Sequence, residues 1–187
     1  LYLMGSSSLG NYPPRFINAI WSTTGDQAHW GSQFWWWNQS CIHHSVYASN
    51  HLELNDPLYR MITDNLGAYA TAAKQQWGSH GIWIPETQWF DGIEELAEED
   101  ASELRALYLE EKPFSDMSTP LRELSLRKHP FSARWNYLFL GTPGGSWENR
   151  GEGIFGHVSH ILVVAPKIAH LFWLRYQHTM DLNWLRD

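Results

Sequence analysis

The feature that most constrains this fold is an apolar pattern with the period of an α-helix, bounded at both ends. Asn55, Asp56 and Pro57 make a helix start, because they offer a capping side chain, an acidic first turn and a residue that needs no backbone donor. Gly78 can supply a left-handed cap at the far end. The apolar positions between these signals are Leu58, Met61, Ile62, Tyr69, Ala72, Ala73 and Trp77. Their spacing predicts a helix over 58–77.

A second segment, Val158–His178, is apolar on nearly every side of a helix and contains Pro166. It predicts a buried helix that starts near Pro166 or is kinked there. Leu1–Gly31 and Gly141–Gly156 are rich in glycine, proline or small polar residues and predict loops, the first around one helical turn. Because strand-like alternation is scarce, the chain is predicted to be all-α.

An acidic segment lies between these two helices. Gly92–Lys112 holds eight Asp and Glu residues and only a thin apolar stripe of Leu96, Leu104 and Leu107. We predict an exposed helix there, inside an acidic helical insertion at 92–132. The later half of that insertion is more basic, so its two halves can pair by charge.

Charge and composition exclude several classes of partner. A formal net charge of -7 disfavours nucleic acid, which needs clustered Lys and Arg to displace counterions, and fits a neutral polar substrate better. No apolar run approaches the ~20 residues that cross a bilayer, so we expect no membrane partner. The single cysteine, Cys41, permits no internal disulfide and leaves the redox compartment open.

Aromatic residues are the unusual part of the composition. The chain has 12 Trp, 8 Tyr and 8 Phe, more flat aromatic surface than its core requires, and the nine residues from Trp30 to Asn38 include amides among the rings. Sugar rings pack their C–H faces on indole, while their hydroxyls need amide or carboxylate partners. We predict a saccharide-binding cleft lined by Trp30, Gln33, Trp35, Trp36, Trp37 and Asn38. The alternative is a tryptophan-rich core corner followed by a helix.

The loop Gly81–Gly92 places Glu86 and Asp91 among aromatic residues directly after the predicted helix. Low polarity around a carboxyl group disfavours its charged form and raises its pKa, as a general acid requires. Glycoside cleavage uses two carboxyl groups, about 5 Å apart for retention and about 6.5 to 9.5 Å apart for inversion. We predict Glu86 and Asp91 as that catalytic pair, with Thr87 and Trp89 lining the cleft. Alternatively, Glu86 fixes the loop, caps a helix or holds a sugar hydroxyl.

Ten histidines raise the question of a metal site, with His43 and His44 adjacent and His157 and His160 three positions apart. Neither spacing matches a strong ligand pattern, and adjacent histidines on a helix point in different directions. We therefore predict no metal and no cofactor. The sequence also contains no serine nucleophile elbow and no nucleotide-binding loop, which disfavours serine hydrolysis and ATP chemistry.

Five segments of the chain occur in a specific order and spacing, namely Pro14–Asn18, Trp30–Asn38, Asp56–Met61, Pro85–Thr87 and Thr179–Leu185. Together they resemble the helical barrel of family ninety-five glycoside hydrolases, the α-fucosidase and α-galactosidase relatives. They resemble more closely an uncharacterised family of related (α/α)6-barrel proteins. The resemblance implies a partial (α/α)6 toroid with long functional loops, so that residues 1–187 are a fragment of one catalytic-type barrel domain.

In the fucosidase-type enzymes, an Asn-x-Asn pair after the Trp-Gly segment activates the attacking water together with an aspartate. Asn38 matches one member of that pair here, while its partner position holds Trp36 or Ser40. The resemblance assigns the family's general acid and aspartate to no residue of this chain. It also implies an extracytoplasmic location, because such relatives are usually exported.

A barrel of six helical hairpins needs roughly twice the residues of this chain. We therefore expect the remaining half of the barrel to lie outside it, although a processed mature protein is the alternative. The predicted function is a glycoside hydrolase acting on a neutral glycan. The alternatives are a non-catalytic saccharide-binding or structural barrel, and a helical interaction domain that uses exposed aromatics as an anchor.

Overall fold

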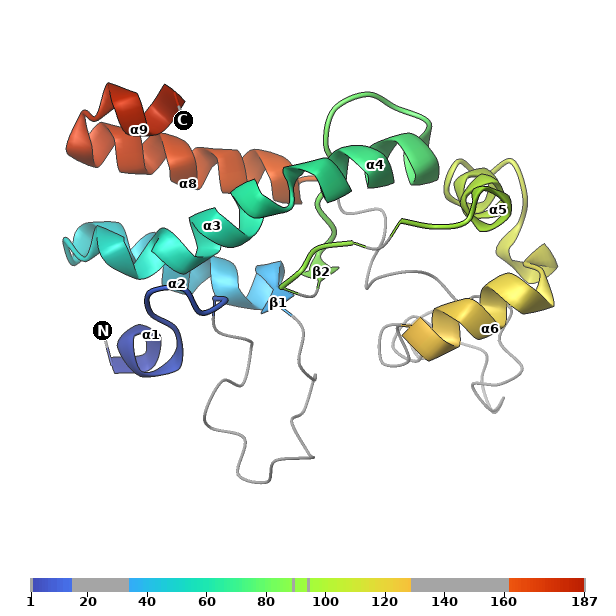
Figure 1. Cartoon of the computed structure of the whole chain (residues 1–187), viewed down its shortest axis with the longest axis horizontal. Coiled ribbons are helices and arrows are strands. Elements are labelled where there is room, and N and C mark those ends of the chain that lie inside the picture. Colours follow the sequence, from blue (N-terminus) through green and yellow to red (C-terminus); the bar gives the residue numbers. More distant parts are fainter. Residues whose placement is uncertain (1, 15–33, 89, 94, 129–161, 187) are drawn as a thin grey trace. The chain divides into compact units, whose positions relative to one another are not determined.

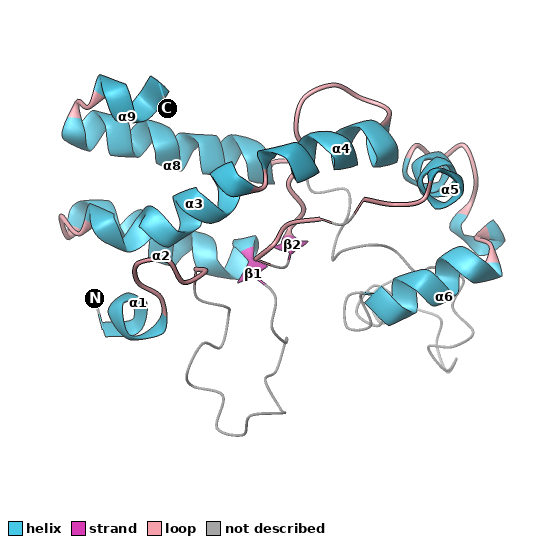
Figure 2. Ribbon diagram, viewed as in Figure 1, coloured by secondary structure: helices cyan, strands magenta, loops and turns pink. Residues whose placement is uncertain are grey.

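The computed structural model describes residues 2–14, 34–88, 90–93, 95–128 and 162–186. These residues are mostly helical, as the sequence predicts, and the only sheet among them has two short strands (Figure 1, Figure 2). The predicted cleft residues Trp30, Gln33 and Trp89, and the predicted loop Gly141–Gly156, lie outside the described residues. None of the helices in the described ranges has both the length and the apolar character needed to cross a bilayer.

The chain divides into two compact units, the first made of Leu1–Leu66, Thr87–Gly92 and Val163–Asp187, the second of Gly67–Glu86 and Ile93–Leu162. The helices and strands of the first unit are α1 (Tyr2–Ser7), β1 (Phe34–Trp35), α2 (Trp36–Ala48), the 3-10 helix η2 (Leu52–Asn55), α3 (Asp56–Asp64), β2 (Thr87–Gln88), α8 (Val164–Thr179) and α9 (Leu182–Arg186). Those of the second are α4 (Leu66–Trp77, from Gly67 onward), α5 (Glu98–Tyr108), the 3-10 helix η3 (Phe114–Asp116) and α6 (Thr119–Lys128).

The helix predicted over 58–77 begins and ends as expected. Helix α3 starts at Asp56 with Pro57 in its first turn, and Gly78 follows α4 with a left-handed φ of 63°. The predicted cap by Asn55 is wrong, because its side chain makes no capping hydrogen bond. Asn55 is instead fully buried against His43, with Oδ1 2.8 Å from His43 Nδ1 and Nδ2 donating to the His43 carbonyl at 3.0 Å.

That predicted helix is nevertheless two helices, because α3 ends before Asn65. The Asn65 side-chain Nδ2 donates at 2.7 Å to the Met61 carbonyl, the acceptor that the Asn65 backbone N–H would reach in a continuous helix. The backbone N–H donates to the Ile62 carbonyl at 3.3 Å instead. The single-helix prediction was wrong because this side-chain amide competes with its own backbone for the same oxygen.

Helix α8 starts at Val164, which confirms the prediction of a start near Pro166. Pro166 falls in the first turn, where its missing N–H is tolerated. The predicted burial on nearly all sides is wrong, since the buried residues Val164, Ile168 and Leu171 follow one face. Trp173 is 47% exposed, because packing against α2 and α9 leaves the rest of the helix open.

One backbone oxygen ties three helices of the first unit together. The Tyr47 hydroxyl of α2 donates to the Leu171 carbonyl of α8 at 2.6 Å, and the Tyr59 hydroxyl of α3 lies 3.2 Å from the same oxygen. The two hydroxyls also bond to each other. Burial raises the pKa of both phenols above their ordinary value, so they stay neutral donors.

The second unit has its own hydrophobic core. Its buried members are Ala72, Ala73, Trp83, Leu96, Ala101, Leu104, Leu107, Tyr108, Met117 and Leu121. The rings of Trp77 and Tyr108 stack at 5.1 Å, and Trp83 meets Trp77 edge-on at 5.7 Å. The predicted acidic helix is therefore present as α5. Its Leu104 and Leu107, and Leu96 just before it, are buried in this core. Whether 92–132 is an insertion stays a prediction.

Glu103, in the middle of α5, binds the segment between that helix and α6. Its Oε1 accepts from Lys112 Nζ and from the Ser118 backbone N–H, both at 2.7 Å, and its Oε2 accepts from the Ser118 hydroxyl at 2.5 Å. Ser118 in turn accepts from the Leu121 N–H at 3.3 Å. Burial opposes ionisation of Glu103, but the hydrogen bonds from Lys112 and Ser118 outweigh it and hold its pKa below the ordinary value.

We predict that Glu103→Gln lowers the free energy of unfolding by about 1 to 3 kcal/mol at neutral pH, because it removes charge-assisted hydrogen bonds. A lowered folded-state pKa stabilises the fold above the ordinary glutamate pKa, and this contribution is lost as pH falls through the lowered value. Urea denaturation followed by circular dichroism across the acid range measures it. The exposed Glu123→Gln is the control, and equal effects of the two variants at neutral pH would contradict the role of Glu103.

Candidate functional site

A two-residue antiparallel ladder joins the two segments that the sequence singled out. Phe34 pairs with Gln88 and Trp35 pairs with Thr87 (Figure 2). The tryptophan-rich segment and the Pro-Glu-Thr loop, separated by the whole of α2, α3 and α4, therefore meet at the backbone. Of the predicted cleft residues, the structure brings Trp35 and Thr87 directly opposite each other.

The tryptophans of the rich segment have different environments. Trp36 is 1% exposed and lies in the core, with its ring 6.5 Å from that of Phe34. The prediction that Trp36 lines a cleft is wrong, because its first position in α2 turns it inward. Trp37 is 62% exposed, with Lys167 Nζ 4.9 Å from its ring centroid, and the next residue, Asn38, is also exposed.

Glu86 and Asp91 differ in their contact with water. Glu86 is 2% exposed and follows the buried residues Trp83 and Ile84. Asp91 is exposed. Glu86 belongs to the second unit and Asp91 to the first, so the structure describes each within its own unit.

Asp91 sits on a turn that only glycine can complete. Gly92 has a φ of 90°, and a Cβ at this position would lie 2.6 Å from Asn65 Oδ1. The Asn65 Nδ2 also donates to the Phe90 carbonyl at 3.0 Å. The same amide that ends α3 therefore restrains the backbone on one side of Asp91, and the positive φ on the other side requires glycine.

The adjacent histidines of α2 face different environments, as predicted. His43 is fully buried against Asn55, whereas His44 is exposed with its ring 6.0 Å from that of His170. Burial, followed by the charges of His170 and Lys167, holds the pKa of His44 below its ordinary value. Among the residues that the structure describes, no three His, Cys, Asp or Glu side chains gather where a metal ion could bind.

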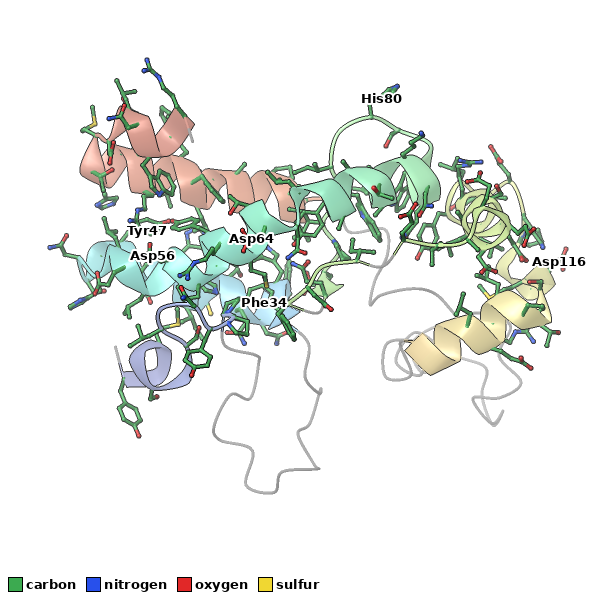
Figure 3. The ribbon with its side chains drawn as sticks, in the orientation of Figure 1. Phe34, Tyr47, Asp56, Asp64, His80 and Asp116 are labelled. Atoms are coloured by element: carbon green, nitrogen blue, oxygen red, sulfur yellow. The ribbon has the colours of Figure 1, made fainter. Side chains whose placement is uncertain are left out.

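The sequence did not predict a pocket of about 460 Å³ in the first unit, where α3, α8 and α9 meet. This volume falls within the roughly 300 to 1,000 Å³ typical of small-molecule sites. The lining residues are Asp56, Tyr59, Arg60, Thr63, Phe172, Arg175 and Trp184. Figure 3 labels Asp56 at the start of α3. No local pattern indicated this pocket, because its Asp56 and Arg175 stand 119 positions apart.

Three aromatic rings form one wall of the pocket. Phe172 and Trp184 stack at 5.5 Å with 28° between their planes. Tyr59 meets both edge-on, at 4.6 Å from Phe172 and 5.1 Å from Trp184. These are the offset and edge-to-face geometries that aromatic quadrupoles prefer, so the wall is packed and preformed.

Arg175 is held against that wall. Its Nη1 donates to Asp56 Oδ1 at 2.6 Å and to the Leu52 carbonyl at 3.0 Å. Its Cζ lies 5.1 Å from the Trp184 ring centroid and 5.5 Å from that of Tyr59. With a side chain only 18% exposed, the guanidinium is fixed by an ion pair, a carbonyl and two rings.

Arg60 adds a second positive charge to the pocket. Its Nη1 donates to Asn11 Oδ1 at 2.5 Å and its Nη2 donates to the Gly10 carbonyl. Neither partner is charged. Because the lining contains two arginines and one aspartate, the pocket is locally positive in a chain whose formal net charge is -7.

Comparisons of the chain with models of protein families, with curated proteins and with solved structures each return no match.

We predict opposite outcomes for neighbouring tryptophans. Trp36→Ala leaves a cavity in the core and lowers the free energy of unfolding by roughly 3 to 5 kcal/mol, whereas Trp37→Ala removes an exposed ring and changes it by less than about 1 kcal/mol. Urea denaturation of the two variants measures the difference. Similar losses from both would contradict the assignment of Trp36 to the core and of Trp37 to the surface.

Proposed function

We propose that this chain is part of a carbohydrate-active domain that hydrolyses glycosidic bonds of a neutral glycan. The observation that carries the proposal is the ladder that pairs Trp35 with Thr87, directly beside Glu86. The ladder pairs the aromatic segment with Thr87, and the residue before Thr87 in the sequence is the buried Glu86. That combination suits a sugar, whose apolar face packs on indole and whose leaving oxygen needs a proton donor.

In this proposal Glu86 is the general acid. Glu86 is 2% exposed, and the role proposed for it is to protonate the leaving oxygen. Asp91 is exposed and so in contact with water, as a base that activates a water molecule must be. The hydrogen bond from Asn65 to the Phe90 carbonyl supports this role, because it restrains the backbone next to Asp91.

Trp37 and Asn38 are the proposed sugar contacts on the α2 side. Both are exposed at the start of that helix, where Trp37 offers a ring face and Asn38 offers an amide in a different direction. Trp35 and Thr87 pair at the backbone directly before this helix begins. Trp30, Gln33 and Trp89 stay proposed lining residues from the sequence alone.

The wider setting rests on the resemblance to (α/α)6-barrel hydrolases. We propose that the helices of both units are hairpin elements of such a toroid, whose remaining hairpins lie outside this chain. An extracytoplasmic location follows from the same resemblance. The helical content and the absence of strands beyond the short ladder in the described part support this architecture over a sheet-based hydrolase.

The second candidate function is saccharide binding without catalysis. The exposed ring of Trp37 favours it, because the apolar face of a sugar can pack on an exposed indole without any proton transfer. In that case Glu86 is a buried structural carboxyl group of its loop.

We predict that Glu86→Gln abolishes hydrolysis while leaving glycan binding unchanged within about twofold, since the amide keeps the shape but cannot donate a proton as an acid. The measurement is release of reducing sugar from a panel of neutral plant and host glycans by the full-length protein, with binding followed by calorimetry.

Glu95→Gln is the matched control, because Glu95 is exposed and lies in the same connecting segment. It should retain full activity. Glycan binding without hydrolysis by the unmodified protein would favour the binding function, and hydrolysis that survives Glu86→Gln would remove Glu86 from the mechanism.

A further inference from the structure

We propose that the pocket between α3, α8 and α9 binds a six-membered ring that carries a carboxylate and neighbouring hydroxyls, the chemistry of a uronic acid unit. This site is separate from the one proposed around Glu86 and does not depend on it. The proposal rests on one donor edge, one aromatic wall and the local charge.

The donor edge belongs to Arg175. Both N–H groups of its Nη1 are directed to Asp56 and Leu52, at 2.6 and 3.0 Å. Among the described residues, its Nε and Nη2 atoms have no hydrogen-bond partner. Nε–H and the adjacent Nη2–H form a pair of parallel donors, the fork that matches the two oxygens of a carboxylate.

This edge is fixed before any ligand arrives. The ion pair with Asp56 and the rings of Tyr59 and Trp184 hold the guanidinium plane, so little rotamer entropy remains to be lost on binding. The ion pair occupies one Asp56 oxygen, Oδ1, and leaves Oδ2 as an acceptor for a ring hydroxyl. The Thr63 hydroxyl at the rim adds a further polar group.

The net positive charge of the lining favours a negatively charged ligand. Asp56 neutralises one of the two arginines, and the partners of Arg60 are an amide and a backbone carbonyl. A neutral sugar would use the same ring wall and hydroxyl contacts but would leave the Arg175 fork without an anion. We therefore expect the acidic sugar to bind more tightly than its neutral parent.

Calorimetry with the full chain tests this with three probes, sodium galacturonate, galactose and sodium benzoate. Galacturonate should bind at least about tenfold more tightly than galactose, the difference expected from one charge-assisted hydrogen-bond pair, and its affinity should fall with added salt. Equal affinity for galacturonate and galactose, or no galacturonate binding at millimolar concentration, would overturn the proposal. Tighter binding of benzoate than of galacturonate would overturn its sugar part.

Two variants localise the binding. Arg175→Lys keeps the charge but loses the fork, so galacturonate affinity should fall by about tenfold or more. Thr63→Trp adds a ring at an exposed rim position, where the fold is not at stake, and should block binding by filling the pocket. Arg186→Lys, on α9 but outside the lining, is the control. Undiminished galacturonate binding in Thr63→Trp would place the site elsewhere and refute the proposal.

Discussion

The first unit depends on the hydrogen bonds that converge on the Leu171 carbonyl. Tyr47 from α2 and Tyr59 from α3 both reach this oxygen of α8, and their hydroxyls contact each other. A hydroxyl that stays buried without a partner costs about 1 to 3 kcal/mol, so a shift of one helix that keeps these groups buried is opposed by the loss of their hydrogen bonds. The same hydrogen bonds restrain the wall of the pocket, because Tyr59 lines it and Arg175, another lining residue, lies one helical turn beyond Leu171.

Local signals in the sequence located helix ends well. The start at Asp56, the cap at Gly78 and the start of α8 near Pro166 follow from backbone constraints that involve only neighbouring residues. The break at Asn65 did not follow, because asparagine inside a helical pattern gives no indication that its amide will take the Met61 carbonyl. The sequence also could not predict that α8 is buried on one side only, since this depends on which elements pack against the helix.

The candidate sites divide in the same way. The sequence could group Trp35 with Thr87 on chemical grounds, but the ladder that pairs them is a tertiary fact. It could not separate Trp36 from Trp37, because one residue of rotation on α2 decides which ring enters the core. The pocket between α3, α8 and α9 could not be predicted, since each of its residues looks like an ordinary helix residue in the sequence and the pocket forms only where the three helices meet.

The ladder between β1 and β2 is only two residues long, so its own hydrogen bonds define its register weakly. Phe34 and Gln88 form one of its two pairs and are 1% and 3% exposed. Successive strand residues point to opposite faces, so a register slip of one position would expel both from the interior. Two pairs cannot resist such a slip on their own hydrogen bonds. The register is therefore set by burial of Phe34 and Gln88, which holds two distant stretches of the chain in one alignment.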